Sequence, residues 1–393
     1  MNKTVYADNA ATTALSKTAF EAMLPYLTTE YGNPSSAYSF GRYAKRAIQN
    51  AREKVASAIG ALSEEIYFTS GGTEADNWAI KGVAELRKNK GQHIISTEIE
   101  HHAVLDTLRH LEKQGFEVTY LKIDQYGGIS LDDLRKAIRP ETILITVMAA
   151  NNEIGTIMPI AEIGAIAREA GVLFHTDAVQ AVGHIPVNAA EMNIDLLSLA
   201  AHKFRGPKGA GALFVKKGLR LPALLHGGGQ EHKLRSGTEN VAGIVGLGAA
   251  LEEAFSNMEE NMRKVSALRD RLISGVMKIP RIRLTGDPIN RLPGIASFAI
   301  EGAEGEAMVM MLEQNGICAS SGSACSSGSQ EASHVLLAMG LPNQLAHSSL
   351  RFSLNEDNSE KDVDYILEKL PVIVSRLREL SPVWNTVKAG ANA

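Results

Sequence analysis

The sequence predicts an α/β protein in which a mostly parallel sheet carries helices on both faces and a smaller α+β domain follows. Between residues 66 and 175, short apolar runs typical of strands alternate with amphipathic stretches typical of helices. This alternation indicates parallel strands, because each helix returns the chain to the same end of the sheet. After about residue 255 the alternation gives way to a long charged helix and short strands, which indicates the second domain.

The individual elements follow from these patterns in chain order. An extended segment of small residues, 3–14, precedes helices at 16–27 and 41–59. The expected strands of the sheet are 66–69, 93–96, 117–121, 142–148, 172–175, 194–201 and 210–215, and the expected helices among them are 73–89, 104–114, 131–138 and 160–170. The later part predicts helices at 258–278, 304–315 and 362–377 and strands at 281–284 and 295–300. We therefore expect a large domain of residues 15–257 and a small domain that combines 1–14 with 258–393.

The composition is that of an ordinary globular protein. Of the 393 residues, 45% are hydrophobic and 21% are charged, and the formal net charge is −4. No run of Lys or Arg favours nucleic acid as a partner, and the longest apolar runs are far too short to span a membrane. Asp8 and Asn9 lie where a secretory signal would need an apolar segment. Because the two cysteines exclude a disulfide scaffold and suit a reducing compartment, we expect a cytoplasmic protein.

Lys203 lies where the expected strand 194–201 meets a turn rich in Gly and Pro, before the expected strand 210–215. A lysine at such an apolar edge loses hydration, which disfavours its charged form. A neutral amine can act as a Schiff-base nucleophile. Taken alone, the residue is better interpreted as a surface lysine in a turn, and only its neighbours overturn that interpretation.

A phosphate-binding turn is predicted between a strand and a helix at Ser70-Gly71-Gly72-Thr73. The two glycines let the backbone approach a ligand, and the N–H groups of the helix N-terminus attract an anion. The alternative is an ordinary turn in which Ser70 or Thr73 caps the helix.

Polar residues also follow other predicted strands. Asp177 ends one of them, and a buried carboxylate there needs a cation, which a protonated pyridine nitrogen would supply. It could instead cap a helix that begins at Ala178. Asn152 could hydrogen-bond a ring substituent or cap a loop. His101 could stack on a cofactor ring and move protons near neutral pH, or be a solvated or capping histidine.

The remaining candidates lie in loops and in the later part of the chain. Cys325 lies in the Gly/Ser-rich loop 319–329, which predicts an exposed and movable thiol; an incidental thiol in a linker is the alternative. Cys318 has the pattern of a small buried hydrophobic residue. Arg351, on a predicted strand, could bind a carboxylate or form an internal salt bridge. The loop that carries Thr238 could reach the phosphate of a neighbouring subunit or be a flexible connector.

Together these features predict pyridoxal 5'-phosphate chemistry on an amino acid, with a cysteine nucleophile added. A transaminase or a plain lyase of the same fold would use Lys203 without Cys325. A catalytically silent scaffold would have no chemical need for the intact set. A metal-dependent hydrolase, which belongs to a different class, would use His101, His102, His175 and Asp177.

The ordered motifs resemble those of cysteine desulfurases of the NifS/IscS type, in the class V aminotransferase-like group of fold type I enzymes. The resemblance spans nearly the whole chain. Its motifs are Asp8-Asn9-Ala10-Ala11-Thr12-Thr13, Gly32-Asn33-Pro34-Ser35-Ser36, Ser70-Gly71-Gly72-Thr73-Glu74, Glu100-His101-His102-Ala103-Val104, Asn151-Asn152-Glu153-Ile154-Gly155, Asp177-Ala178-Val179-Gln180, His202-Lys203, Gly206-Pro207-Lys208-Gly209, Gly227-Gly228-Gly229-Gln230-Glu231, Arg235-Ser236-Gly237-Thr238 and Ser321-Gly322-Ser323-Ala324-Cys325. The resemblance implies the fold of pyridoxal-phosphate transferases of type I, with a mostly parallel seven-stranded sheet. It also implies a homodimer, L-cysteine as substrate, and a sulfur-accepting protein such as an iron–sulfur scaffold.

The same resemblance implies a role for each candidate residue. Lys203 would bind the cofactor aldehyde and remove the Cα proton of the substrate, with His101 aiding proton transfer. Cys325 would attack the substrate sulfur, so that L-alanine leaves and a persulfide remains. Arg351, with Asn152, would bind the substrate carboxylate. The implied cofactor contacts are Gly72, Thr73 and His202 with the phosphate, Thr238 of the partner subunit with the same phosphate, Asp177 with the ring nitrogen, Gln180 and Asn152 with the ring hydroxyl, and His101 with the ring face.

The sequence departs from the family pattern at two positions. Ala200 stands where the family usually has a serine, so one hydroxyl donor to the phosphate is missing. Tyr38 stands where the family often has a histidine. The preference for cysteine over selenocysteine and the identity of the sulfur acceptor stay open.

Overall fold

The computed structural model describes residues 4–322, 332–381 and 384. Its largest element is a seven-stranded sheet with the strand order β2-β8-β7-β6-β5-β3-β4. The strands are β2 (Ile66–Thr69), β3 (His93–Thr97), β4 (Glu117–Leu121), β5 (Thr142–Thr146), β6 (Leu173–Asp177), β7 (Leu196–Ala200) and β8 (Gly211–Val215). β8 runs antiparallel to both of its neighbours, and the other neighbouring pairs are parallel. The predicted α/β fold class and the mostly parallel sheet are therefore confirmed.

Helices cover both faces of this sheet. They are α1 (Lys17–Thr28), α2 (Ser39–Ala58), α3 (Gly72–Arg87), α4 (His102–Glu112), α5 (Leu131–Ala137), α6 (Ile160–Ala170) and α7 (Val241–Ser256). Successive side chains of a strand point to opposite faces: Ile94 and Leu144 pack with α3 and α4, whereas Ile95 belongs to the core shared with α2, α6 and α7. With both faces covered, β3, β5, β7 and β8 are buried along their whole length, whereas the edge strand β4 is mostly only partly buried.

The helix α7 was not predicted from the sequence. Its residues are rich in Gly and Ala and apolar on nearly every side, so it shows little amphipathic pattern. Its buried residues belong to the same core as those of α1 and α2. Gly248 packs so closely on α2 that a Cβ there would lie 2.9 Å from the Ala51 Cα atom. Small residues at this crossing let the helix backbones approach.

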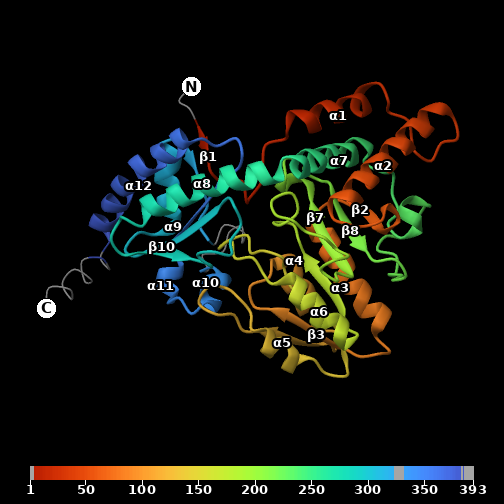
Figure 1. Ribbon diagram of the computed structural model, residues 1–393, viewed down its shortest axis with the longest axis horizontal. Helices are drawn as coiled ribbons and strands as arrows, with labels where there is room; N and C mark the ends of the chain where they lie inside the picture. Colours follow the sequence, from red (N-terminus) through yellow and green to blue (C-terminus); the bar gives the residue numbers. More distant parts are fainter. Residues whose placement is uncertain (1–3, 323–331, 382–383, 385–393) are drawn as a thin grey trace.

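A second, smaller body contains an antiparallel sheet of β9 (Ile282–Thr285), β10 (Ile295–Ile300) and β12 (Ser349–Ser353), and a parallel pair of β1 (Val5–Tyr6) and β11 (Ile317–Cys318). Its helices are α8 (Met258–Val276), α9 (Gly305–Gln314) and α12 (Glu360–Leu380). The short helices α10 (His334–Ala338) and α11 (Asn343–Ala346) lie between α9 and α12 in the chain, and their buried apolar residues belong to the core of the large sheet. Figure 1 shows α7 and α8 following one another from the large sheet toward this body. One apolar core joins β1, α8, β10, α9, β12 and α12. The division into domains 15–257 and 1–14 with 258–393 stays a prediction.

Among the described residues, no helix is both long enough and apolar enough to cross a membrane.

Candidate active site

A cavity of about 400 Å³ lies at the carboxyl end of the large sheet, where it meets β12. It brings together side chains from far-separated parts of the sequence. The predicted site residues that line it are Gly72, Thr73, His101, Asn152, Asp177, Gln180, His202, Lys203 and Arg351. Only the fold brings them together, because they follow different strands and belong to both bodies.

Lys203 ends a short 3-10 turn, η2 (Ala201–Lys203), directly after the fully buried strand β7. Its Nζ donates to the carbonyl oxygens of Ala10 at 2.6 Å and Ala11 at 2.8 Å. The backbone of this turn is held in place, because a ring nitrogen of the partly buried His184 lies 2.9 Å from the Lys203 carbonyl oxygen. The amine is thus held at the cavity wall by neutral carbonyl groups.

The turn before α3 leaves the helix N-terminus open toward the cavity. Gly71 is the N-cap, with φ 154° and ψ −176°, a conformation that is essentially restricted to glycine, and no side chain caps the helix. Ser70 hydrogen-bonds instead to Glu74, so capping by Ser70 or Thr73 is wrong. A Cβ on Gly72 would lie 2.7 Å from the Cγ2 atom of Val179, another cavity residue. The unpaired N–H groups of this first turn suit a phosphate.

Asp177 is the last residue of β6, and its side chain is buried beside the cavity. Its Oδ1 accepts a hydrogen bond from the Val179 backbone at 2.9 Å. Burial raises the pKa of Asp177, while the nearby His101 and Lys203 oppose that rise. No helix begins at Ala178, so capping of a helix by Asp177 is wrong. Gln180, three residues on, donates to the Ala10 carbonyl at 2.9 Å.

His101 is the N-cap of α4, where its Nδ1 accepts from the Ala103 N–H at 3.1 Å. Nδ1 is therefore an acceptor, and in the neutral ring the proton lies on Nε2. Burial lowers the pKa of His101, with Asp177 opposing and Lys203 reinforcing the shift. The residue is both a helix cap and a neutral imidazole at the cavity wall.

Arg351 enters the cavity from β12 and is buried. Its Nη2 lies 2.9 Å from the Asp8 carboxylate, and its Nη1 donates to the Asn152 carbonyl oxygen at 2.8 Å. The internal salt bridge considered for Arg351 therefore exists. Its Nε is buried and has no hydrogen-bond partner among the described residues, which leaves one N–H of the guanidinium unused.

Two predicted residues lie apart from this cavity. Thr238 is exposed and lines a separate cavity with Arg235 and Asn240. Cys325 lies outside the described residues, as do the other residues of 323–331. Cys318 is described: it lies on β11 and is only partly buried, so the prediction of a small buried hydrophobic residue is wrong as to its burial.

Sequence reasoning missed several residues of the cavity wall, of which Asp76 is the most polar. Asp76 lies four residues after Gly72, which places both on one face of α3. That spacing could have identified it. Ala200, where the family pattern predicts a serine, also lines the cavity.

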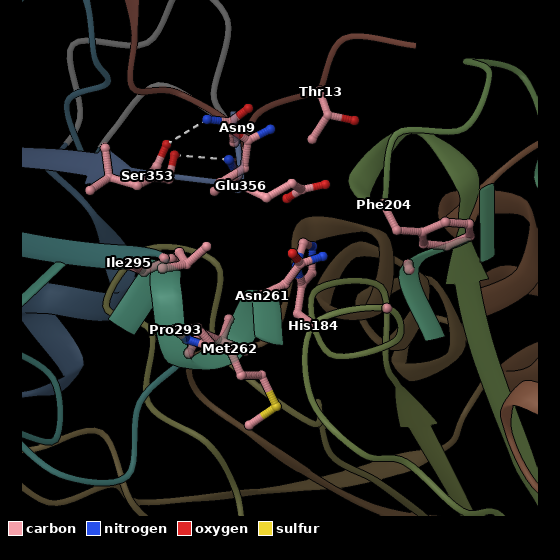
Figure 2. A pocket seen from close by; sticks show the side chains of 18 of the residues that line it. Asn9, Thr13, His184, Phe204, Asn261, Met262, Pro293, Ile295, Ser353 and Glu356 are labelled. Atoms are coloured by element: carbon pink, nitrogen blue, oxygen red, sulfur yellow. Dashed lines mark hydrogen bonds between the residues drawn. The ribbon is translucent and has the colours of Figure 1, made fainter. Parts of the chain in front are cut away.

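A second, tighter cavity adjoins the first on the other side of Ala10 and Gln180. Figure 2 shows Asn9 hydrogen-bonded to Ser353 on one side of this cavity, with Glu356, His184 and Phe204 among the other side chains that line it. Arg205, with φ 65°, spans this junction through an ion pair of 3.0 Å with Glu356. This contact joins the turn after Lys203 to the smaller body.

The four residues of the metal-hydrolase alternative are not arranged as a ligand set. Among the described residues, no group of three or more His, Cys, Asp or Glu side chains could hold a metal ion. His175 uses both ring nitrogens in contacts with Thr146 and Ser198.

The larger cavity fits pyridoxal 5'-phosphate. Its volume is within the range of small-molecule sites. It offers an uncapped helix N-terminus, a close approach over Gly72, a buried carboxylate and a lysine amine. These are the groups that bind a phosphate, a pyridine nitrogen and an aldehyde.

Comparison with known proteins gives a consistent result. Residues 5–366 match the family model described as aminotransferase class-V. The chain is 57% identical over 382 residues to a cysteine desulfurase IscS of Methanosarcina thermophila, covering 97% of this chain and 95% of the relative. A solved NifS-like protein superposes with a TM-score of 0.90 at 39% identity, over 95% of this chain and all of that one. A structure titled SspA in complex with cysteine superposes with a TM-score of 0.80 at 38% identity, over 89% of this chain and 99% of that one.

Proposed function

The chain belongs to the class-V aminotransferase family, among its cysteine desulfurases of the NifS/IscS type, and on this premise we propose how it removes sulfur from L-cysteine to leave L-alanine. The observation that supports the residue roles is the convergence of Lys203, Asp177, His101 and Arg351 on one cavity. A catalytic lysine, a carboxylate, an imidazole and a carboxylate-binding arginine are the groups that this chemistry requires.

Pyridoxal 5'-phosphate, when bound, supplies an electron sink that weakens bonds at the Cα and Cβ atoms of the substrate. The chain would hold it through contacts along the cavity wall. The proposed contacts are Gly72, Thr73 and His202 for the phosphate, Asp177 for the ring nitrogen, Gln180 and Asn152 for the ring hydroxyl, His101 for the ring face and Lys203 for the aldehyde. Thr238 is proposed to contact the same phosphate from the partner subunit.

Proton transfer falls to Lys203 and His101. With cofactor and substrate bound, the Lys203 amine would take the Cα proton of the substrate. His101, whose neutral ring carries its proton on Nε2, can donate that proton within the cavity. Arg351 orients the substrate by binding its carboxylate, for which the unused Nε–H is available.

Cys325 is proposed to attack the substrate sulfur and to keep it as a persulfide. The thiolate forms a new S–S bond to the substrate sulfur while the Cβ–S bond breaks, and the electron pair of that bond remains on the carbon skeleton that becomes alanine. The persulfide sulfur would then pass to an acceptor protein, such as an iron–sulfur scaffold.

Substitution of Cys325 by serine tests this proposal. We expect Cys325→Ser to bind the yellow cofactor like the parent and to lose formation of alanine and of a persulfide. The matched control is Cys318→Ser, because Cys318 is the chain's other cysteine and lies on β11, so it should keep full activity. Full desulfurase activity in Cys325→Ser would remove the thiol from the mechanism, and formation of a keto acid in place of alanine would indicate a transaminase.

A homodimer is proposed as the working form. Exposed large apolar side chains gather on α1, the start of α2 and the loop between them. They are Phe20, Leu24, Leu27, Tyr31, Tyr38, Phe40 and Tyr43. An apolar patch of this kind marks a protein interface more often than a solvated surface. Tyr38, the unexplained departure from the family pattern, is one of its members.

We further propose that the protein works in the cytoplasm. A reaction that leaves sulfur on a thiol requires that thiol to be reduced beforehand, which a reducing compartment provides.

A further inference from the structure

Asp76 is a buried carboxyl group in the cofactor cavity to which the proposed function gives no role. It lies on α3 one helical turn after Gly72 and is 1% exposed. Its Oδ1 atom has no hydrogen-bond partner among the described residues. The nearest ring nitrogen is Nε2 of His175, at 3.6 Å. A buried polar atom without a partner is costly, so the position calls for an explanation.

His175 cannot supply the cation that an ionised Asp76 would need. Its Nδ1 lies 2.8 Å from the Thr146 hydroxyl and its Nε2 lies 3.0 Å from the Ser198 hydroxyl. Burial lowers the pKa of His175 to about 3, so the ring is neutral at physiological pH. The other titratable groups that act on Asp76 are Asp177 on β6 and Glu100 in the loop after β3, and both are acids.

Asp177 is in a different electrostatic position. It faces His101 and Lys203, which oppose the effect of burial on its pKa. Two neighbouring buried carboxyl groups cannot both be ionised without a large cost, so one of them keeps a proton. Burial and the charge of Asp177 raise the pKa of Asp76 well above its ordinary value. The proton therefore belongs on Asp76.

We propose that Asp76 is a positioning residue of the cofactor cavity: a neutral carboxylic acid that holds the proton of the pair, so that Asp177 alone is the carboxylate facing a protonated ring nitrogen. This inference rests on the role proposed for Asp177. With Asp76 neutral, Asp177 carries the only negative charge of the pair. The positive charge of a protonated ring nitrogen then balances it. The Ser198 hydroxyl hydrogen-bonds to the Asp76 side chain, and Nε2 of His175 lies 3.6 Å from its Oδ1 atom.

The test uses the full-length protein stripped of cofactor, with the variants Asp76→Asn and Asp177→Asn. Asparagine mimics a neutral acid, so Asp76→Asn should bind added pyridoxal 5'-phosphate within about threefold of the parent at pH about 8, whereas Asp177→Asn should bind it about tenfold to a hundredfold more weakly. Urea unfolding gives an independent reading. The unfolded Asp76 loses its proton above about pH 4 and the folded one keeps it, so folding of the parent becomes less favourable as pH rises.

The urea midpoint of Asp76→Asn should therefore exceed that of the parent at pH about 8, and the difference should shrink toward pH about 5. Glu85→Gln, an exposed charge removal on the same helix, should show no such pH trend. Two results for Asp76→Asn would together overturn the proposal: a urea midpoint below that of the parent at pH about 8, and a loss of cofactor affinity as large as that of Asp177→Asn. Asp76 would then be an ionised ligand. If Asp177→Asn binds the cofactor as tightly as the parent does, the role proposed for Asp177 is wrong. The pH dependence of urea unfolding would still show whether Asp76 is neutral.

If Asp76→Asn does not fold, the parent protein decides the matter. With aspartate labelled by 13C at Cγ, one carboxyl carbon of the parent should keep the chemical shift of a protonated acid at neutral pH. Absence of any such signal contradicts a neutral Asp76.

Discussion

The large seven-stranded sheet and the small three-stranded sheet of this protein bury opposite kinds of side chain. The small sheet packs Phe298, Leu350 and Phe352 fully into an apolar core with α8, α9 and α12. The carboxyl end of the large sheet instead buries acids and hydroxyls, among them Asp76, Glu100 and Thr176, each with a polar atom that has no hydrogen-bond partner among the described residues. Such atoms lower stability and are kept where they serve a ligand or a reaction.

The strand β12 shows both kinds of environment within five residues. Leu350 and Phe352 point into the apolar core of the smaller body. The alternate residues point to the junction: Ser349 accepts from the Gly322 N–H, Arg351 binds Asp8, and Ser353 accepts from the Ala10 N–H. The period of two along a strand thus lets one element stabilise the fold and build the site.

The largest expected effect is on activity, at the polar end of the large sheet. Lys203→Ala removes the lysine amine from the cavity. Among the described residues that line the cavity, the only other Lys or Arg side chain is that of Arg351. We expect production of alanine from cysteine to fall about a thousandfold or more, with little change in the urea midpoint. Lys208→Ala, an exposed lysine of the same loop, is the control and should retain activity. Activity of Lys203→Ala close to that of the parent would contradict the assignment of catalysis to this end of the large sheet.

The next effect is on stability, in the apolar core of the small sheet. Phe352→Ala leaves a cavity between β10 and the helices and should lower the free energy of unfolding by about 3–5 kcal/mol. The folded fraction should still bind the cofactor, because Phe352 points away from the site. Phe255→Ala, at a half-exposed position, should cost far less. Equal losses in the two variants, measured by urea unfolding, would show that the core is not the source of stability assigned to it.

A smaller effect concerns the pH dependence of stability, through Glu100. Burial raises the pKa of Glu100 to about 8, and its Oε2 has no hydrogen-bond partner among the described residues. The unfolded side chain ionises above about pH 4, so the folded protein loses stability as pH rises from there to about 8. Glu100→Gln should remove this loss, so its advantage over the parent grows with pH up to about 8. Glu98→Gln, an exposed neighbour, should show a constant offset in the same urea titrations.

Much of the fold could be predicted because its signals are local. Apolar runs such as Leu196–Ala200 predict buried strands, and the polar residues after them predict the ligand-binding edge. The helix α7 escaped prediction because a helix that is apolar on nearly every side has no period to detect. Nine candidate residues lie in one cavity. Most of them were singled out from their own sequence context, whereas Gln180 and His202 were identified only through the resemblance to a family.

The contacts that hold the site together could not be predicted, because they depend on how distant segments pair. The Arg351–Asp8 ion pair joins residues that are 343 positions apart, and the Lys203–Ala10 hydrogen bond spans 193. A bridge between Asp8 and Ser353, at the end of β12, places Asp8 near Arg351. No local pattern in the sequence encodes that register.

The most direct test of the account is to find which side chain binds the cofactor aldehyde. The holoenzyme is reduced with borohydride, which fixes the aldehyde to its amine, and is then digested and analysed by mass spectrometry. The account predicts that the cofactor mass lies on Lys203 alone and that the yellow absorption disappears on reduction. Cofactor attached to another lysine, with Lys203 unmodified, would contradict it.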